Sequence, residues 1–336
     1  MRPRIWNFIL CSLVATAAVT FEHRARAEVP SIINVAVPPP GSSGYIIATG
    51  ISKVLTDKTP IKKVTLQTFG GAAGWPVRMQ SGEVNFGAHC GFKQLEEAHY
   101  GQGAFEKFGK QKNVLNMVSG HGLPFAMSIL DPKIKRFEDL KGKTIFLMST
   151  HRDHLTAMQT VMKVAGLTMG QDVKTISVRS PREAISGMLT GRGDGFFAGV
   201  IPGLAEVQRA RGLYAVPMSE RMLDEVIASE PVFGRTVIPV DASPLRPKDP
   251  VPTLKTLCGI AAGARTSEEA VYLFVKTTFE HFNEWSSVHP LAKQWSIKGA
   301  ASVMNAPYHP GAIRYYREKG VWSVEQDAKQ KELSAR

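Results

Sequence analysis

The sequence predicts an α/β protein built from two lobes that share one plan. Short apolar strands alternate with glycine- or serine-rich loops and with segments whose apolar residues recur at helical spacing. This strand, loop and helix order favours parallel sheets whose loops gather at one edge, where such folds bind ligands. The chain of 336 residues also exceeds the usual limit of about 250–300 residues for one hydrophobic core, which indicates two domains.

The first unit runs from an apolar strand at residues 32–37 through the loop 41–45 into a helix. Ser42 and Ser43 are both natural N-caps, and Gly44 lets a ligand approach the free N–H groups of the first helical turn. The helix dipole favours negative charge there, so the pattern indicates a site for a small anion. A capped helix in any α/β domain gives the same pattern.

A second unit follows the first and ends at the same edge of the predicted sheet. A strand at 64–68 leads into Gly70, Gly71 and Ala72, whose N–H groups can bind a carboxylate or whose small size can simply serve chain reversal. After the next helix, a third strand ends at His89. We expect His89 either to contact a ligand or to be a hydrogen-bonded structural histidine.

The second half of the chain repeats this plan. A strand at 143–147 is followed by a polar loop and a helix that ends at Gly166, and then by a strand at 173–178 and a helix at 182–189. The segment 190–198 echoes the segment 81–88. These repeats indicate a second lobe with the plan of the first.

The polar loop of the second lobe contributes further candidates for ligand contacts. Ser149, Thr150 and His151 supply hydrogen-bonding groups, and Arg152 offers a planar fork to a carboxylate at a helix N-terminus. The alternative for Arg152 is a solvated side chain or a pair with Asp153. The histidines and the aspartate of this loop lack the spacing of a known zinc pattern, so we expect no metal.

Two aromatic residues, Tyr45 and Phe197, are candidates for apolar walls of the site. The proline-rich stretch 232–255 favours an extended path back to the first lobe. There, Thr266 and Glu269 predict a capping box at the start of a long helix, and the aromatic residues near Tyr315 are expected in the core.

The first 27 residues have the pattern of a secretory signal, with arginines before an apolar stretch and an A-x-A site that ends at Ala27. We therefore expect an exported, periplasmic protein that begins at Glu28. The leader holds four arginines and one glutamate, so it accounts for three of the twelve net positive charges. The remaining basic residues are dispersed, which argues against nucleic acid and favours small anions as partners.

Cysteine usage and motifs give little support to catalysis. Cys90 and Cys258 remain after export, and their spacing does not decide whether they form a disulfide. The loop at Gly41 lacks the Lys-Ser/Thr of a phosphate-binding loop, and no Gly-x-Ser-x-Gly motif is present. We therefore expect neither enzymatic activity nor a cofactor.

Several motifs, in order along the chain, resemble one family, the TAXI-type solute-binding proteins of tripartite ATP-independent periplasmic (TRAP) transporters. They cover nearly all of the expected mature chain and are Gly41-Ser42-Ser43-Gly44-Tyr45, Gly70-Gly71, Ser81-Gly82-Glu83, Asp139-Leu140-Lys141-Gly142-Lys143, Phe196-Phe197-Ala198-Gly199, Val251-Pro252-Thr253, His309-Pro310-Gly311-Ala312 and Tyr315-Tyr316-Arg317-Glu318-Lys319-Gly320.

The resemblance implies a two-lobed periplasmic binding protein fold of type II with two hinge-crossing strands. It implies lobe one at 28–124 and 253–336 and lobe two at 125–252. It also implies that a monomer closes on a dicarboxylate, a 2-oxo acid or an acidic amino acid and delivers it to a TRAP-type membrane permease. An enzyme on the same fold, or an exported sensor for a membrane receptor, are the alternatives.

Overall fold

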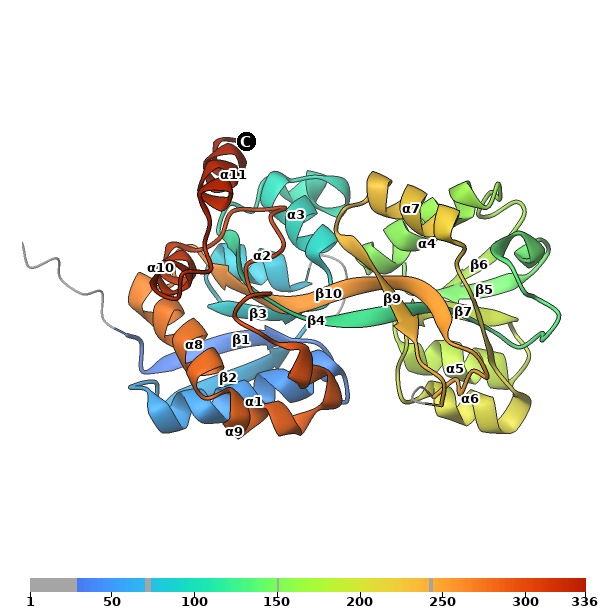
Figure 1. Cartoon of the computed structure of the whole chain (residues 1–336), viewed down its shortest axis with the longest axis horizontal. Coiled ribbons are helices and arrows are strands. Elements are labelled where there is room, and N and C mark those ends of the chain that lie inside the picture. Colours follow the sequence, from blue (N-terminus) through green and yellow to red (C-terminus); the bar gives the residue numbers. More distant parts are fainter. Residues whose placement is uncertain (1–28, 70–73, 150, 242–243) are drawn as a thin grey trace, which may run out of the picture.

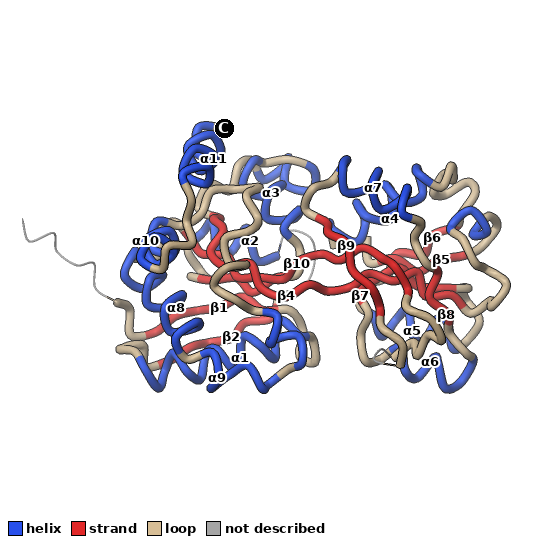
Figure 2. Tube along the Cα trace, in the orientation of Figure 1, coloured by secondary structure: helices blue, strands red, loops and turns tan. Residues whose placement is uncertain are grey.

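The computed structural model describes residues 29–69, 74–149, 151–241 and 244–336. The described chain forms two lobes, and two long strands run from one into the other (Figure 1). A single ten-stranded sheet has the order β2-β1-β3-β10-β4-β7-β5-β6, with β8 beside β4 and β9 beside β10. Strands run through the middle of both lobes and helices cover them (Figure 2).

Lobe one is built on three parallel strands, in which β1 pairs with both β2 and β3. The central strand β1 is an almost continuous apolar run because it is covered on both faces, whereas the edge strand β2 is only half-buried. The strands of this lobe are β1 (Ile32–Val37), β2 (Lys63–Thr68) and β3 (Phe86–His89). Its helices are α1 (Ser43–Lys58), α2 (Gly74–Ser81), α3 (Phe92–Tyr100), α8 (Glu268–Glu280), α9 (Phe282–Trp285), α10 (Pro310–Glu318) and α11 (Val324–Ala335), with 3-10 turns η1 (Gly103–Phe108), η3 (Ser286–Val288) and η4 (Pro290–Gln294).

The two long strands, β4 (Val114–Ile129) and β10 (Val251–Gly263), belong to both lobes. They pair with each other in antiparallel fashion along most of their length. In lobe one β3 pairs with β10 at residues 259–262, and in lobe two β7 pairs with β4 at residues 125–129. Each long strand therefore leaves one lobe and enters the other in the middle of the sheet.

Lobe two repeats the architecture of lobe one around a parallel core in which β5 pairs with β6 and β7. Its strands are β5 (Thr144–Leu147), β6 (Lys174–Ser177), β7 (Gly195–Gly199), β8 (Tyr214–Val216) and β9 (Phe233–Ile238). Its helices are α4 (Arg152–Val164), α5 (Pro181–Leu189), α6 (Leu204–Arg211) and α7 (Glu220–Ser229), with the 3-10 turn η2 (Phe137–Leu140).

The two lobes share a detailed hydrogen-bond pattern, as the echo of 81–88 in 190–198 suggests. In lobe one the Asn85 side chain accepts from the N–H of Asn34, and in lobe two the Asp194 side chain accepts from the N–H of Thr144, at 2.9 and 2.7 Å. In each case the same residue also donates its own N–H to the partner's C=O. The repeat is therefore structural as well as sequential. In each lobe a polar residue just before a strand, β3 or β7, fixes that strand to the neighbouring parallel strand, β1 or β5.

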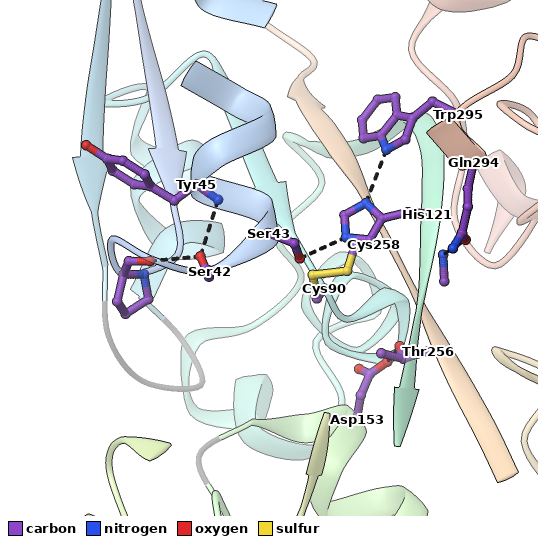
Figure 3. Close-up of a disulfide and its surroundings, with 12 residues drawn as sticks. Ser42, Ser43, Tyr45, Cys90, His121, Asp153, Thr256, Cys258, Gln294 and Trp295 are labelled. Atoms are coloured by element: carbon purple, nitrogen blue, oxygen red, sulfur yellow. Dashed lines mark hydrogen bonds between the residues drawn. A yellow bond between two sulfur atoms is a disulfide. The ribbon is translucent and has the colours of Figure 1, made fainter. Parts of the chain in front are cut away.

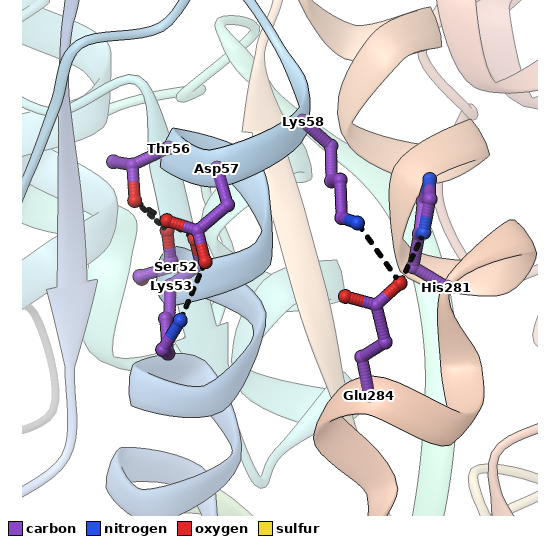
Figure 4. A network of polar contacts seen from close by, with 7 residues as sticks. All are labelled: Ser52, Lys53, Thr56, Asp57, Lys58, His281 and Glu284. Carbon is purple, nitrogen blue, oxygen red and sulfur yellow. Dashed lines mark hydrogen bonds and ion pairs between the residues drawn. The ribbon is translucent and has the colours of Figure 1, made fainter.

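Helix α1 is attached to the C-terminal part of lobe one by a polar network (Figure 4). Glu284 on α9 accepts a hydrogen bond from His281 at 2.7 Å and lies 3.3 Å from Lys58, the last residue of α1. A cation at the end of a helix is favoured by the helix dipole. The network holds α9 against the C-terminal end of α1.

The expected core of the C-terminal segment is confirmed, since Tyr315 and Tyr316 are almost completely buried. The capping box predicted for Thr266 and Glu269 is wrong, because the N-cap is Ser267 and not Thr266. Helix α8 begins at Glu268, and its cap is Ser267, whose hydroxyl accepts from the N–H of Ala270. The Thr266 hydroxyl instead donates to the C=O of Asn85, because it lies beside the turn that follows β10.

Candidate functional site

The N-terminus of α1 lies at the carboxyl end of β1, as the sequence predicts, and only one of the two serines caps it. The Ser42 hydroxyl accepts from the N–H of Tyr45 at 3.2 Å and donates to the C=O of Pro39 at 2.8 Å. Both of its hydrogen-bonding functions are therefore used within the loop. The described residues supply no partner for the N–H groups of Ser43 and Gly44, which remain as donors at the positive end of the helix.

Ser43 belongs to a chain of hydrogen-bonded side chains that the sequence does not predict. Its Oγ lies 2.9 Å from Nε2 of His121, and Nδ1 of that histidine accepts from the indole N–H of Trp295 at 3.1 Å (Figure 3). His121 belongs to β4, and Trp295 directly follows η4. Both are almost completely buried, and burial lowers the pKa of His121 to about 3.

A disulfide between Cys90 and Cys258 lies beside this chain (Figure 3). The antiparallel register of β3 and β10 pairs Gly259 with His89, so the next pair along the same register is Cys90 with Cys258. The disulfide thus joins the end of β3 to one of the two strands that cross between the lobes. In this form Cys90 is not a free thiol and cannot act as a nucleophile.

His89 is buried at the same place, with its side chain 4% exposed. Its ring stacks on Trp75 and meets the edge of Phe92. Neither ring nitrogen forms a hydrogen bond among the described residues, and burial lowers the pKa of His89 to about 3, which the Gly91 backbone opposes only in part. Buried polar atoms without a partner are uncommon, so they point to a group that completes the site.

A small cavity of about 10 Å³ lies between these groups, and it has roughly the size of one water molecule. Its walls bring together the start of α1, the end of β3, and interior positions of β10 and β4. The residues that line it are Gly44, Ile47, Ala48, Ala88, His89, His121, Cys258, Gly259, Ile260 and Trp295. The structure therefore places the predicted residues Gly44 and His89 together with His121, Cys258 and Trp295, which were not predicted.

On the side of lobe two, the predicted residues His151 and Arg152 lie at the N-terminus of α4, but Arg152 already has a partner. Its guanidinium donates to both carboxylate oxygens of Glu97 on α3, at 2.6 and 2.9 Å. The pair joins lobe two to lobe one and is mostly buried. Arg152 is therefore neither solvated nor paired with Asp153 in this structure. That it binds a ligand carboxylate stays a prediction, and such binding would require the ion pair with Glu97 to open.

The neighbours of Arg152 are buried polar groups. His151 and His154 stack with ring centroids 4.9 Å apart, and among the described residues the Nδ1 atom of each lacks a hydrogen-bond partner. Burial lowers the pKa of both histidines. Asp153 is completely buried and accepts from the Thr256 hydroxyl at 2.7 Å and from the N–H of Gln94 at 3.4 Å.

The remaining predicted site residues are spread over several environments. Ser149 is hydrogen-bonded to Ser177, and Tyr45 packs against the core of lobe one with its ring directed away from Ser43 (Figure 3). Phe197 is completely buried against Phe125, so it forms no wall that a ligand can reach in this structure. The predicted residues Gly70, Gly71, Ala72 and Thr150 lie outside the described part of the chain.

A model of the NMT1-like family matches residues 35–320. The chain belongs to the NMT1-like family. A solved structure described as a periplasmic transporter resembles this NMT1-like protein with a TM-score of 0.50 at 14% identity, over 89% of this chain and 95% of that chain. The alkanesulfonate-binding protein SsuA from Xanthomonas axonopodis pv. citri, bound to MOPS, gives a TM-score of 0.49 at 13% identity, over 91% of this chain and 96% of that chain. The predicted type II periplasmic binding protein fold is confirmed.

The described residues of the NMT1-like protein bring three atoms that can bind a metal within 4.8 Å of one another, from Cys90, Cys258 and His121. The two sulfur atoms are bonded to each other, and zinc requires thiolates. Both ring nitrogens of His121 are hydrogen-bonded as well. The oxidised form of this cluster therefore does not offer a metal its usual ligands. No helix in the described ranges of the chain is long and apolar enough to cross a membrane.

The ion pair between the lobes of this NMT1-like protein gives a first testable prediction. Glu97→Gln removes the carboxylate charge and leaves Arg152 without its ionic partner, so we expect the free energy of unfolding to fall by about 1–3 kcal/mol. Urea unfolding measures this loss. The matched control is Asp57→Asn, which breaks the exposed pair with Lys53 and should change little. Equal stability of Glu97→Gln and the parent protein would show that the pair does not hold the lobes together.

Proposed function

We propose that this protein is an extracytoplasmic solute-binding protein that captures a small organic anion and delivers it to a membrane permease. The observation that carries the proposal is the two-lobed sheet with two crossing strands, in which the N-terminus of α1 lies beside the buried ring of His89, whose nitrogens have no hydrogen-bond partner among the described residues. Membership of the NMT1-like family and the likeness to a periplasmic transporter support the class.

Charge and hydrogen bonding support an anion as the solute. The N–H groups of Ser43 and Gly44 are donors at a helix N-terminus, where negative charge is stabilised. The chain without its leader keeps nine of its twelve net positive charges, which attracts anions from a distance. We include dicarboxylates, 2-oxo acids and acidic amino acids in the proposed class, and a TRAP-type permease as the partner, on the strength of the motifs shared with TAXI-type proteins.

Binding in this proposal is coupled to movement of the lobes about β4 and β10. A solute held by groups from both lobes favours the closed arrangement, and the permease recognises that arrangement. The predicted signal sequence, with cleavage after Ala27, supplies export to the periplasm; residues 1–28 lie outside the described part of the chain.

The direct test is a thermal-shift screen of the mature protein with succinate, 2-oxoglutarate and L-glutamate, together with mass spectrometry of any compound released by denaturation. Saturation at about 100 times the dissociation constant contributes roughly 2.7 kcal/mol, so an anion that binds should raise the unfolding temperature clearly. Sugars and simple cations are the controls. Stabilisation by these controls alone would contradict an anion-binding function.

A further inference from the structure

The hydrogen-bond chain from Trp295 through His121 to Ser43 has a direction, and the chemistry of its first member determines it. An indole nitrogen carries a hydrogen and can only donate. The Nδ1 atom of His121, at 3.1 Å from that nitrogen, must therefore accept and carries no proton. Trp295 thus selects the tautomer of a histidine on another element of the fold.

The second nitrogen of His121 must then hold the proton. The ring is 99% buried and makes no ion pair among the described residues, so it is neutral in the working range of pH. A neutral imidazole has one N–H, which is consequently at Nε2 and donates to Ser43 Oγ at 2.9 Å. The Ser43 hydroxyl is an acceptor in this bond, and its own hydrogen remains available.

The free hydrogen of Ser43 lies at the start of α1 beside two further donors that have no acceptor within the described ranges, the N–H groups of Ser43 and Gly44. The described residues supply no acceptor for this hydroxyl. Ser42 differs, because its hydroxyl both donates and accepts within the loop. The buried ring of His89, which has no hydrogen-bond partner in the described part of the chain, lines the same small cavity as Gly44 and His121 and is an independent sign that a further group belongs here.

We propose that Trp295 and His121 are positioning residues that hold the Ser43 hydroxyl as a donor toward the anionic group of the solute. This inference rests on the proposed function and deepens it. It separates Ser43, which binds the solute, from Ser42, which caps the helix. The Ser43 hydroxyl and the two backbone N–H groups beside it favour a carboxylate or sulfonate oxygen, which accepts from all of them, over an ammonium group, which can only donate.

The first experiment reads the tautomer directly and needs no solute. Long-range ¹H–¹⁵N NMR spectra of the histidine rings, with His121 identified by its loss in His121→Gln, should show the Nε2–H form in the parent protein. Trp295→Phe removes the indole N–H and keeps an aromatic ring, so the Nδ1–H form should appear. The matched control is Trp285→Phe, which removes an indole N–H that is bonded to Thr278 in the same core and should leave His121 unchanged.

The second experiment measures affinity for succinate, 2-oxoglutarate and L-glutamate by calorimetry. Ser43→Ala and Trp295→Phe should each weaken the best of the three by about tenfold or more, and the double variant should bind no more weakly than Ser43→Ala alone. Ser52→Ala removes a hydroxyl about two and a half turns further along α1 and should stay within about twofold.

The outcomes separate the two proposals. The Nδ1–H tautomer in the parent protein, or a Trp295→Phe variant that binds within about twofold of the parent, overturns the positioning role while the solute-binding function stands. A parent protein that binds none of the three carboxylates contradicts the proposed class of solute and, with it, the role of Ser43 toward an anion. The NMR spectra would still show which nitrogen of His121 carries the proton, and therefore the direction of the hydrogen bonds from Trp295 to Ser43.

Discussion

Loss of the Cys90–Cys258 disulfide should lower the free energy of unfolding by about 2–5 kcal/mol. The bond joins residues that are 168 positions apart, so it removes much of the freedom of the unfolded chain. It also ties the end of β3 to β10, one of the two strands shared by the lobes. Urea or thermal unfolding of the mature protein with and without a reductant measures the effect.

The matched variant for this experiment is the double substitution Cys90→Ser and Cys258→Ser. It should unfold like the reduced parent, and a reductant should not change it. The mature chain is expected to contain no further cysteine, because Cys11 lies within the predicted leader, so exchange with a third thiol does not complicate the comparison. If the reduced parent, with both thiols counted by mass, unfolds at the same urea concentration as the oxidised protein, the disulfide does not stabilise the fold.

The architecture could be predicted because its signals are local. The strands and helices of each lobe follow from apolar periodicity and from glycines at the turns, as at Gly82 and Gly191, which both have positive φ. The echo between the lobes appears in the sequence because Asn85 and Asp194 must each lock a strand in the same way. Local constraints of this kind leave a pattern that one sequence can show.

The site could be predicted only in part, because its partners come from distant segments. Ser43 is separated from His121 by 78 residues, and His121 from Trp295 by 174. One signal was present, since His121 stands between two glycines inside a strand. A Cβ atom at Gly120 would lie 2.3 Å from the Trp295 ring, so the glycine permits the close approach that the chain of hydrogen bonds needs.

Arg152 is a second residue whose partner could not be predicted from the sequence. A guanidinium at a helix N-terminus in a polar loop has the chemistry to hold a carboxylate, and it does hold one, that of Glu97. The sequence identifies the chemistry of Arg152 correctly but not its partner. The carboxylate comes from α3 of the other lobe, 55 residues away, and no local pattern connects the two.

Asp153→Asn should remove a strong dependence of stability on pH. Asp153 is completely buried where α3 of lobe one meets α4 of lobe two, and burial raises the pKa of its carboxyl to about 7. The hydrogen bonds from Thr256 and Gln94 and the charge of Lys93 oppose this shift, and the charge of Glu97 adds to it. The folded protein therefore holds a proton on Asp153 more tightly than the unfolded chain does.

The sign of the effect follows from this difference. Below the unfolded pKa of about 3.8 the proton is bound in both states, and the contribution of Asp153 to stability is fully present. As the pH rises from there to the folded pKa of about 7, only the folded protein keeps the proton, and this contribution is lost at about 1.4 kcal/mol per pH unit, or roughly 4 kcal/mol in all. Asparagine keeps an oxygen for the Thr256 hydroxyl and does not titrate, so the stability of Asp153→Asn relative to the parent should rise between pH 5 and pH 8.

Urea unfolding of both proteins at pH 5 and pH 8 measures this difference. The control is Asp172→Asn, because the pKa of Asp172 is lowered by the hydrogen bond from the Thr168 N–H and by Lys141. Its contribution has the opposite sign: it is present above the unfolded pKa and is lost as the pH falls, so Asp172→Asn should be less stable than the parent at both values of pH. If the stability of Asp153→Asn relative to the parent is the same at pH 5 and pH 8, the Asp153 carboxyl titrates normally, and the contact between α3 and α4 does not hold its proton.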